Sequence, residues 1–164
     1  MDMKMNKPPF IIVGVGNILC SDEGVGVHII NRLKKMDLPD YVGIYDCGTN
    51  GIAVLEALDG CKKGIIIDAV SMGGPPGKIY RFTVDDILQM EDNLFKLVSL
   101  HQFDLISTLK VAQITNVYHL PKDIVIIGIE GKSFDFSLEL TNEVANVIPD
   151  VIRIVMEEIK SFKD

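Results

Sequence analysis

Short apolar runs alternate with amphipathic segments along the whole chain. Four runs rich in Ile and Val predict β-strands at residues 10–16, 41–47, 64–70 and 123–130. Three of these runs are almost continuously apolar, which is typical of parallel strands covered on both faces. A fifth run, residues 78–84, alternates in polarity and follows the turn-forming MGGPPG, so it predicts a strand at the edge of the sheet.

Between these runs, apolar residues recur at the spacing of amphipathic helices. We expect helices at residues 23–36, 50–58, 102–115 and 141–162. Ser21 or Asp22 would cap the first helix, and Thr49 the second. The last helix should kink or restart at Pro149, because proline removes a backbone donor and clashes with the preceding turn. This order of elements predicts an α/β fold, a three-layer α/β/α sandwich around a mostly parallel, about five-stranded sheet.

The composition narrows the class of protein. With 164 residues, 48% of them hydrophobic, the chain fits one domain over residues 1–164, with residues 1–8 as a flexible N-terminus. The net charge of −7 and the absence of a Lys/Arg cluster argue against nucleic acid or an anionic membrane as partner. No signal peptide or membrane-spanning run is expected.

The three cysteines, Cys20, Cys47 and Cys61, form no C-x-x-C pair. An odd number without paired spacing argues against a disulfide framework or a zinc ribbon and favours a reducing, cytoplasmic setting. Cys20 and Cys47 have no neighbouring base in the sequence, so a buried, unreactive thiol is the better expectation for both. The chain also lacks the G-x-S-x-G and H-E-x-x-H motifs of serine hydrolases and zinc proteases.

The segment VGVGNILCSDEGVG, residues 13–26, combines a glycine-rich turn with two carboxylates. Gly14 and Gly16 fit a dinucleotide-binding fingerprint, but its third glycine is replaced by Leu19. Asp22 and Glu23 would also place negative charge where a pyrophosphate needs bare N–H groups. A nucleotide site therefore remains a weak alternative. Stabilisation of the helix N-terminus would explain both acids, and it is compatible with Glu23 binding a metal.

Asp68 and His101 are the other residues with candidate chemistry. Asp68 follows four apolar strand residues, so we expect it at the carboxyl end of a buried strand, where open α/β sheets bind ligands; capping of the next loop is the alternative. His101 precedes a predicted helix, whereas His28 and His119 lie mid-helix and in a loop. Glu23, Asp68 and His101 each fall near a strand-to-helix junction. One imidazole and two carboxylates would suit a divalent ion such as Ni, Zn or Fe.

At these residues the chain resembles the hydrogenase maturation proteases, endopeptidases that trim the C-terminus of nickel–iron hydrogenase large subunits. The matching segments are collinear from residue 10 to about residue 159: VGVGNILCSDEGVGV, DCGTNG, IIIDAV, SLHQ and GIEGKSFDFSLELTNEV. The resemblance implies that Glu23, Asp68 and His101 are the metal-binding and catalytic residues. It also implies a substrate-contact loop that contains Asp46, Gly48, Thr49 and Gly51, with Cys47 in place of a usual glycine.

The resemblance further implies that the nickel belongs to the substrate. The protease would cut the large-subunit precursor only after Ni²⁺ has been inserted, by an aspartic-type or metal-assisted mechanism. A nickel-dependent maturation chaperone that binds the precursor without cutting it is the alternative. The expected partner in both cases is the large-subunit precursor.

Overall fold

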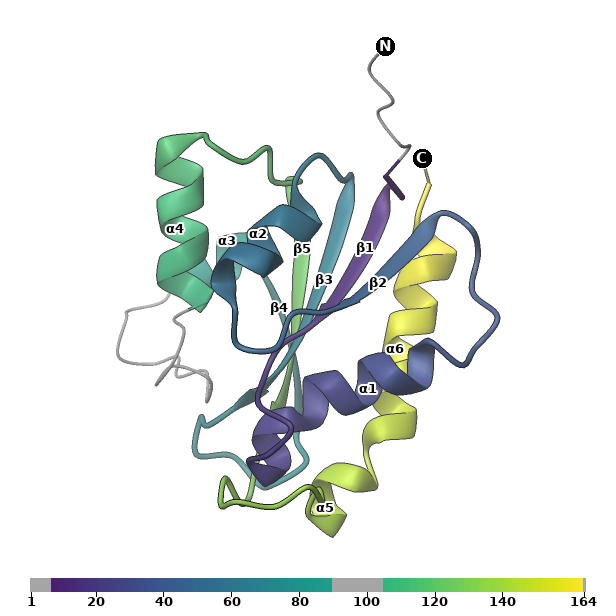
Figure 1. Ribbon diagram of the computed structural model, residues 1–164, viewed down its shortest axis with the longest axis vertical. Helices are drawn as coiled ribbons and strands as arrows, with labels where there is room; N and C mark the ends of the chain where they lie inside the picture. The colour runs from purple at the N-terminus through teal and green to yellow at the C-terminus, as the bar shows by residue number, and fades with distance from the viewer. Residues whose placement is uncertain (1–6, 90–104, 164) are drawn as a thin grey trace.

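The computed structural model describes residues 7–89 and 105–163 and contains one five-stranded sheet in the order β2-β1-β3-β5-β4 (Figure 1). The strands are β1 (Phe10–Gly14), β2 (Val42–Asp46), β3 (Lys63–Val70), β4 (Ile79–Thr83) and β5 (Asp123–Glu130). β2, β1, β3 and β5 are parallel, whereas β4 pairs with β5 in the antiparallel direction. Each strand lies within the predicted run or one residue beyond it, and the edge position of β4 is confirmed.

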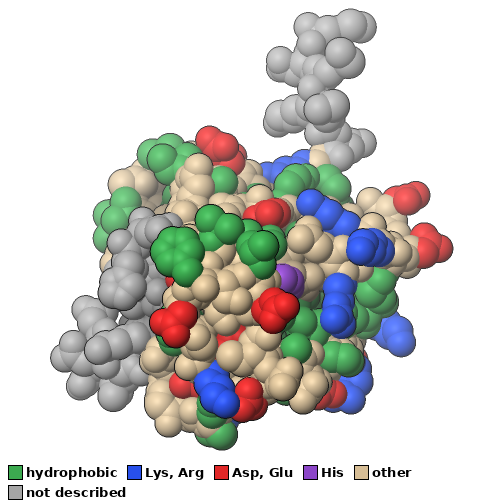
Figure 2. All heavy atoms as spheres, turned by 60° about the horizontal axis from the view of Figure 1, so that its bottom comes forward, with side chains coloured by type: hydrophobic (Ala, Val, Ile, Leu, Met, Phe, Trp, Pro, Cys, Tyr) green, Lys and Arg blue, Asp and Glu red, His purple; other side chains and the backbone are tan. Residues whose placement is uncertain are grey.

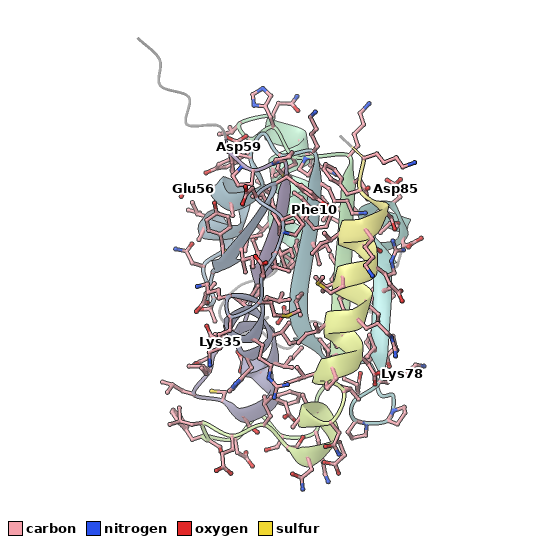
Figure 3. The ribbon with its side chains drawn as sticks, turned by 90° about the vertical axis from the view of Figure 1, so that its right-hand side faces the viewer. Phe10, Lys35, Glu56, Asp59, Lys78 and Asp85 are labelled. Carbon is pink, nitrogen blue, oxygen red and sulfur yellow. The ribbon has the colours of Figure 1, made fainter. Side chains whose placement is uncertain are left out.

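Helices cover both faces of this sheet, which confirms the predicted three-layer sandwich. On one face, α1 (Val25–Leu33) and α6 (Ile148–Ser161) pack against Phe10, Ile65 and Ile67. α6 runs along the sheet in Figure 3, and near its C-terminal end the ring of Phe10 packs edge-on against Phe162, with 5.3 Å between ring centroids. On the other face, α2 (Gly51–Leu58) and α4 (Leu105–Thr115) pack against Ile11, Ile66 and Ile126.

The helices begin differently from the prediction. A short 3₁₀ helix, η1 (Ser21–Gly24), precedes α1, and neither Ser21 nor Asp22 caps α1 with its side chain. Asn50, not Thr49, caps α2, because the Asn50 Oδ1 accepts a hydrogen bond from the Ala53 N–H at 3.1 Å. At α1 the predicted caps lie inside η1, and the helix starts after Gly24 without a side-chain cap, whereas α2 is capped by the neighbour of the predicted residue.

The C-terminal helix is interrupted as predicted. α5 (Asn142–Ala145) ends before α6 begins at Ile148, and Pro149 lies in the first turn of α6, where no N–H is required. One short helix, α3 (Val84–Gln89), was not predicted, since Val84 reads as the last residue of a strand. Residues 1–6 of the predicted flexible N-terminus and residues 102–104 of the predicted third helix lie outside the described residues. None of the described helices is long and apolar enough to cross a membrane.

Candidate active site

The N-terminus of α1 packs directly on the carboxyl end of β3. The Val15 N–H donates to the Ile67 carbonyl at 2.9 Å, which extends the β1–β3 ladder one residue beyond Gly14. A Cβ on Gly26 would overlap the same Ile67 carbonyl oxygen. Only glycine at position 26 therefore allows α1 to start this close to β3. The point of contact, Ile67, is the residue before Asp68.

Gly16 shapes the turn that holds Glu23. Its φ of +134° lies outside the range that other residues adopt readily, and a Cβ there would overlap the Glu23 carbonyl oxygen. The space that a phosphate would need against this glycine is filled by the chain's own 3₁₀ turn. Gly16 thus allows the turn after β1 to pack closely against η1. The Glu23 side chain is half-buried there.

Asp68 lies fully buried in the central strand β3. Its neighbour in register on β5 is Gly128, and its Oδ1 accepts a hydrogen bond from the Ala69 N–H at 2.8 Å. Side chains alternate along a strand, so Asp68 shares the sheet face of Ile66 and Val70, which α2 and α4 cover. Its predicted place near the carboxyl end of a buried strand agrees with the structure.

The third predicted ligand, His101, lies outside the described residues. η1, which carries Glu23, and α1 both contact β3, the strand that carries Asp68. Within residues 7–89 and 105–163, no three His, Cys, Asp or Glu side chains gather closely enough to hold a metal ion.

Asp22 has a structural role that the sequence did not indicate. Its carboxylate is fully buried and accepts hydrogen bonds from the backbone N–H groups of Lys132 and Ser133 at 2.8 and 3.1 Å. The N–H and hydroxyl of Thr141 also donate to it, both at 2.8 Å. Asp22 therefore ties residues 132–141, which connect β5 to α5, to the turn that carries Glu23.

The loop from Asp46 to Thr49 borders the same turn. The Asp46 Oδ1 accepts a hydrogen bond from the Gly48 N–H at 2.9 Å, and the Gly16 N–H donates to the Gly48 carbonyl at 2.8 Å. A hollow of about 280 Å³ lies between the two loops and is lined by Gly16, Asn17, Ile18, Val27, Asp46, Gly48 and Thr49. Three of the four predicted substrate-contact residues line this hollow, and the fourth, Gly51, begins α2.

Cys47 fits this loop without strain, because the left-handed conformation falls on Gly48, whose φ is +51°. The Cys47 side chain packs into the core on the α2 face. Burial, and to a lesser degree the Asp46 carboxylate, raises the pKa of its thiol to about 11. Cys47 is therefore protonated near neutral pH and is a poor nucleophile.

Glu130 is a buried acid that the sequence analysis missed. It ends β5 beside Val70, and its carboxylate accepts hydrogen bonds from the N–H groups of Met72 and Gly73 at 3.0–3.1 Å. Burial and the neighbouring Glu130 carboxylate raise the pKa of Tyr80. Glu130 thus anchors the loop after β3, a role that the sequence left open for Asp68. Both residues carry the same signal, an acid at the end of an apolar run.

The comparisons with known proteins agree with one another. A family model described as hydrogenase maturation protease (HycI) matches residues 27–158. A putative hydrogenase maturation protease of Methanocaldococcus jannaschii is 34% identical over 161 residues, which cover 95% of this chain and 99% of that protein. The hydrogenase 2 maturation protease of Escherichia coli is 31% identical over 152 residues, 92% of this chain and 90% of that protein. The structure of the E. coli hydrogenase maturating endopeptidase HybD superposes with a TM-score of 0.77 at 28% identity, covering 92% of this chain and 91% of that one.

Proposed function

The chain belongs to the hydrogenase maturation proteases, endopeptidases that process the C-terminus of a hydrogenase large-subunit precursor, and we propose that it cuts this precursor only after nickel has been inserted. Membership confirms the resemblance seen in the sequence. Three free cysteines favour a reducing compartment, so the proposal places the reaction in the cytoplasm.

One observation supports the proposal: η1, which carries Glu23, packs against β3, which carries Asp68. The segment of Glu23 packs on the end of β3, where Asp68 is fully buried. Asp68 accepts a hydrogen bond from the Ala69 N–H, and it lies at the edge of a parallel sheet where such folds bind ligands. A divalent ion brought there by the substrate would add a partner of opposite charge to the buried carboxylate.

In this proposal, nickel arrives as part of the precursor, and Glu23, Asp68 and His101 complete its coordination. Two carboxylates and an imidazole form a donor set that Ni²⁺ accepts. His101 enters the set from the sequence alone; α4, whose described part begins four residues later at Leu105, covers the sheet face on which Asp68 lies. An ion held there would polarise the scissile carbonyl or activate a water molecule.

A metal-assisted or aspartic-type hydrolysis also agrees with the state of the nearest thiol. Cys47 borders the substrate-contact loop, yet its pKa of about 11 keeps the sulfur protonated near neutral pH. The Asp46–Thr49 loop would then contact the substrate backbone beside the scissile bond, since it lines the hollow next to the Glu23 turn.

Cleavage should depend on the nickel content of the precursor. We expect the purified protein to shorten a nickel-loaded large-subunit precursor and to leave the nickel-free precursor intact. Only the loaded precursor brings an ion that Glu23, Asp68 and His101 can bind. Intact-mass spectrometry of both precursors after incubation measures this. Binding of the loaded precursor without release of a peptide would favour the chaperone alternative. Equal cleavage of both precursors would show that cleavage does not require nickel.

Substitution of the proposed ligands should weaken metal binding without unfolding the protein. Asp68→Asn replaces a charged carboxylate by a neutral amide and His101→Ala removes the imidazole, so we expect at least a ten-fold loss of affinity for Ni²⁺ and loss of precursor cleavage. Isothermal titration calorimetry gives the affinity, and circular dichroism checks the fold. Asp150→Asn is the matched control: the Asp150 carboxylate lies in the first turn of α6, partly exposed and paired with Arg153, so this variant should match the wild type in nickel affinity and cleavage. Full nickel affinity in both ligand variants would show that the ligand set is wrong.

A further inference from the structure

Four exposed apolar side chains meet beside the candidate active site. They come from two segments, and we refer to Ile18, Leu19, Phe136 and Leu138 as the apolar patch. Phe136 is 88% exposed and Leu138 66% exposed. The two segments are joined because the Ser137 N–H donates to the Leu19 carbonyl at 2.9 Å and Cys20 forms a parallel β-bridge with Ser137. Single exposed apolar residues are ordinary, but a group that includes an almost fully exposed Phe marks an interaction surface.

The patch is held in a fixed orientation. Besides the four hydrogen bonds to Asp22, the Ser21 N–H donates to the Ser137 carbonyl at 2.8 Å and the Ser21 Oγ to the Glu139 carbonyl at 2.9 Å. Residues 132–141 thus rest on the same turn at both ends and in the middle. A surface ordered before binding loses less conformational entropy when a partner docks.

The patch is continuous with the candidate active site. Ile18 belongs to the patch and also lines the hollow formed with Asp46 and Gly48. Asp22, which anchors the patch, is the neighbour of Glu23 in the chain. A protein whose chain end enters the hollow therefore contacts Ile18 and comes next to the rest of the patch.

The charges around the patch indicate the chemistry of the partner. Asp135 and Glu139 are exposed within the same loop, whereas the Lys132 ammonium is paired with Glu143 at 2.5 Å. The chain as a whole has a net charge of −7. Figure 2 turns this end of the molecule forward and shows Asp and Glu side chains among exposed hydrophobic ones, with most of the Lys and Arg side chains to the right. An apolar surface edged by Lys or Arg would be complementary.

We propose that the apolar patch is the docking surface for the folded body of the large-subunit precursor, beside the rim that meets its metal and its scissile bond. This rests on the proposed function, because the partner is the protein that this protease processes. The partner surface is apolar with a basic edge. Docking there would bring a loaded, folded precursor to the hollow in one orientation. The patch would then determine the affinity for the folded precursor and leave the rate of the cleavage step unchanged.

The test compares two pairs of exposed side chains. The double variant Phe136→Ala, Leu138→Ala removes half of the patch without opening the core. The control, Val111→Ala with Ile114→Ala, removes two side chains that are 57% and 81% exposed on α4 and do not belong to the patch. With a nickel-loaded large-subunit precursor as substrate, the patch variant should raise KM about ten-fold or more with kcat within about two-fold. The control should keep both constants.

A direct binding measurement separates the two proposals. Biolayer interferometry of the same precursor should show a loss of affinity of about ten-fold or more for the patch variant and none for the control. If the wild type cuts the precursor and the patch variant binds and cuts it equally well, the docking surface is wrong and the function stands. If the wild type binds without cutting and the patch variant loses that binding, the function fails and the docking surface stands. A wild-type dimer that the patch variant converts to monomers, with unchanged precursor affinity, would assign the patch to self-association and overturn the proposal.

Discussion

Asp22 and Glu23 are consecutive carboxylates in different environments. Asp22 is fully buried and accepts four hydrogen bonds from residues 132–141, whereas Glu23 stays half-buried at the rim. Ser21 before them has a φ of +51°, a left-handed conformation that is unfavourable for serine. Its backbone N–H and its hydroxyl are both hydrogen-bonded to the 132–141 segment, which holds it in that conformation.

The sequence could locate Glu23 and Asp68, because each follows an apolar strand in a recognisable pattern. It could not show what Asp22 does, since the groups that bind Asp22 lie 110 to 119 residues further along the chain. A polar residue before a helix is ordinarily a cap, and only the three-dimensional packing reveals that this one binds another loop. Whether His101 joins the two acids stays a prediction.

The close approach of Gly26 to β3 gives a stability prediction. Gly26→Ala places a methyl group against the Ile67 carbonyl, so α1 has to move away from the strand, and we expect a loss of about 2–3 kcal/mol in the free energy of unfolding. Chemical denaturation of wild type and variant measures it. Gly60→Ala is the control: it has open space around it and a φ of +76°, so it should cost about 1 kcal/mol. Equal losses in the two variants would contradict the packing argument.

At the scale of elements, an ionic network fixes α6 to the sheet. Glu158 of α6 pairs with Lys63 of β3 at 2.9 Å and with Arg81 of β4 at 2.6 Å. Lys63, whose side chain is largely buried, also pairs with Asp123 of β5 at 2.9 Å. The network lies at the opposite end of β3 from Asp68, so it can hold the layers together without restricting the candidate active site.

This network predicts a dependence of stability on pH. Burial alone would raise the pKa of Glu158, but hydrogen bonds and charges from Lys63 and Arg81 outweigh it and hold the pKa below the ordinary 4.5. A lowered pKa in the folded state means that the stabilisation is present above pH 4.5 and is lost as the pH falls through the folded value. The free energy of unfolding of the wild type should exceed that of Glu158→Gln by a constant amount between pH 6 and 7.

Below pH 4.5 the difference in the free energy of unfolding between the wild type and Glu158→Gln should shrink. Urea titrations at successive pH values would measure it. Glu157→Gln is the matched control, because its side chain is exposed on the same helix. It should give no comparable difference at any pH. A difference for Glu158→Gln that persists unchanged down to pH 3 would mean that the network does not carry the pH dependence.

The elements themselves were the most predictable part of the chain. The strands follow from continuous apolar runs, and the restart before α6 follows from Pro149. The first residue of a helix is harder to predict, as η1 and Asn50 show, because several polar residues compete to start it. α3 was hidden because Val84 continues the pattern of β4 and six residues contain too few turns to display a helical period.

On the scale of the whole molecule, the order of the strands places the candidate active site and the apolar patch at one end of the sheet. β1 and β3 are neighbours in the sheet, so the turns after them meet at the carboxyl rim, and the segment after β5 reaches the same rim beside Ser21. The sequence predicted this shared rim from the parallel arrangement alone. It did not predict the apolar patch, because the β-bridge and hydrogen bonds that bring the segments of Leu19 and Phe136 together join residues more than a hundred positions apart in the chain.

The hydrogen bonds of Asp22 also set an order of events during synthesis on the ribosome. When the first 130 residues have been made, Glu23 and Asp68 are already part of the chain, but every donor to Asp22 is still missing. A bare carboxylate cannot be buried without those donors, so the turn that carries Glu23 adopts its final form only after Thr141 has emerged. The turn that holds the proposed ligand Glu23 is therefore complete only once residues 132–141 have been synthesised and have folded onto it.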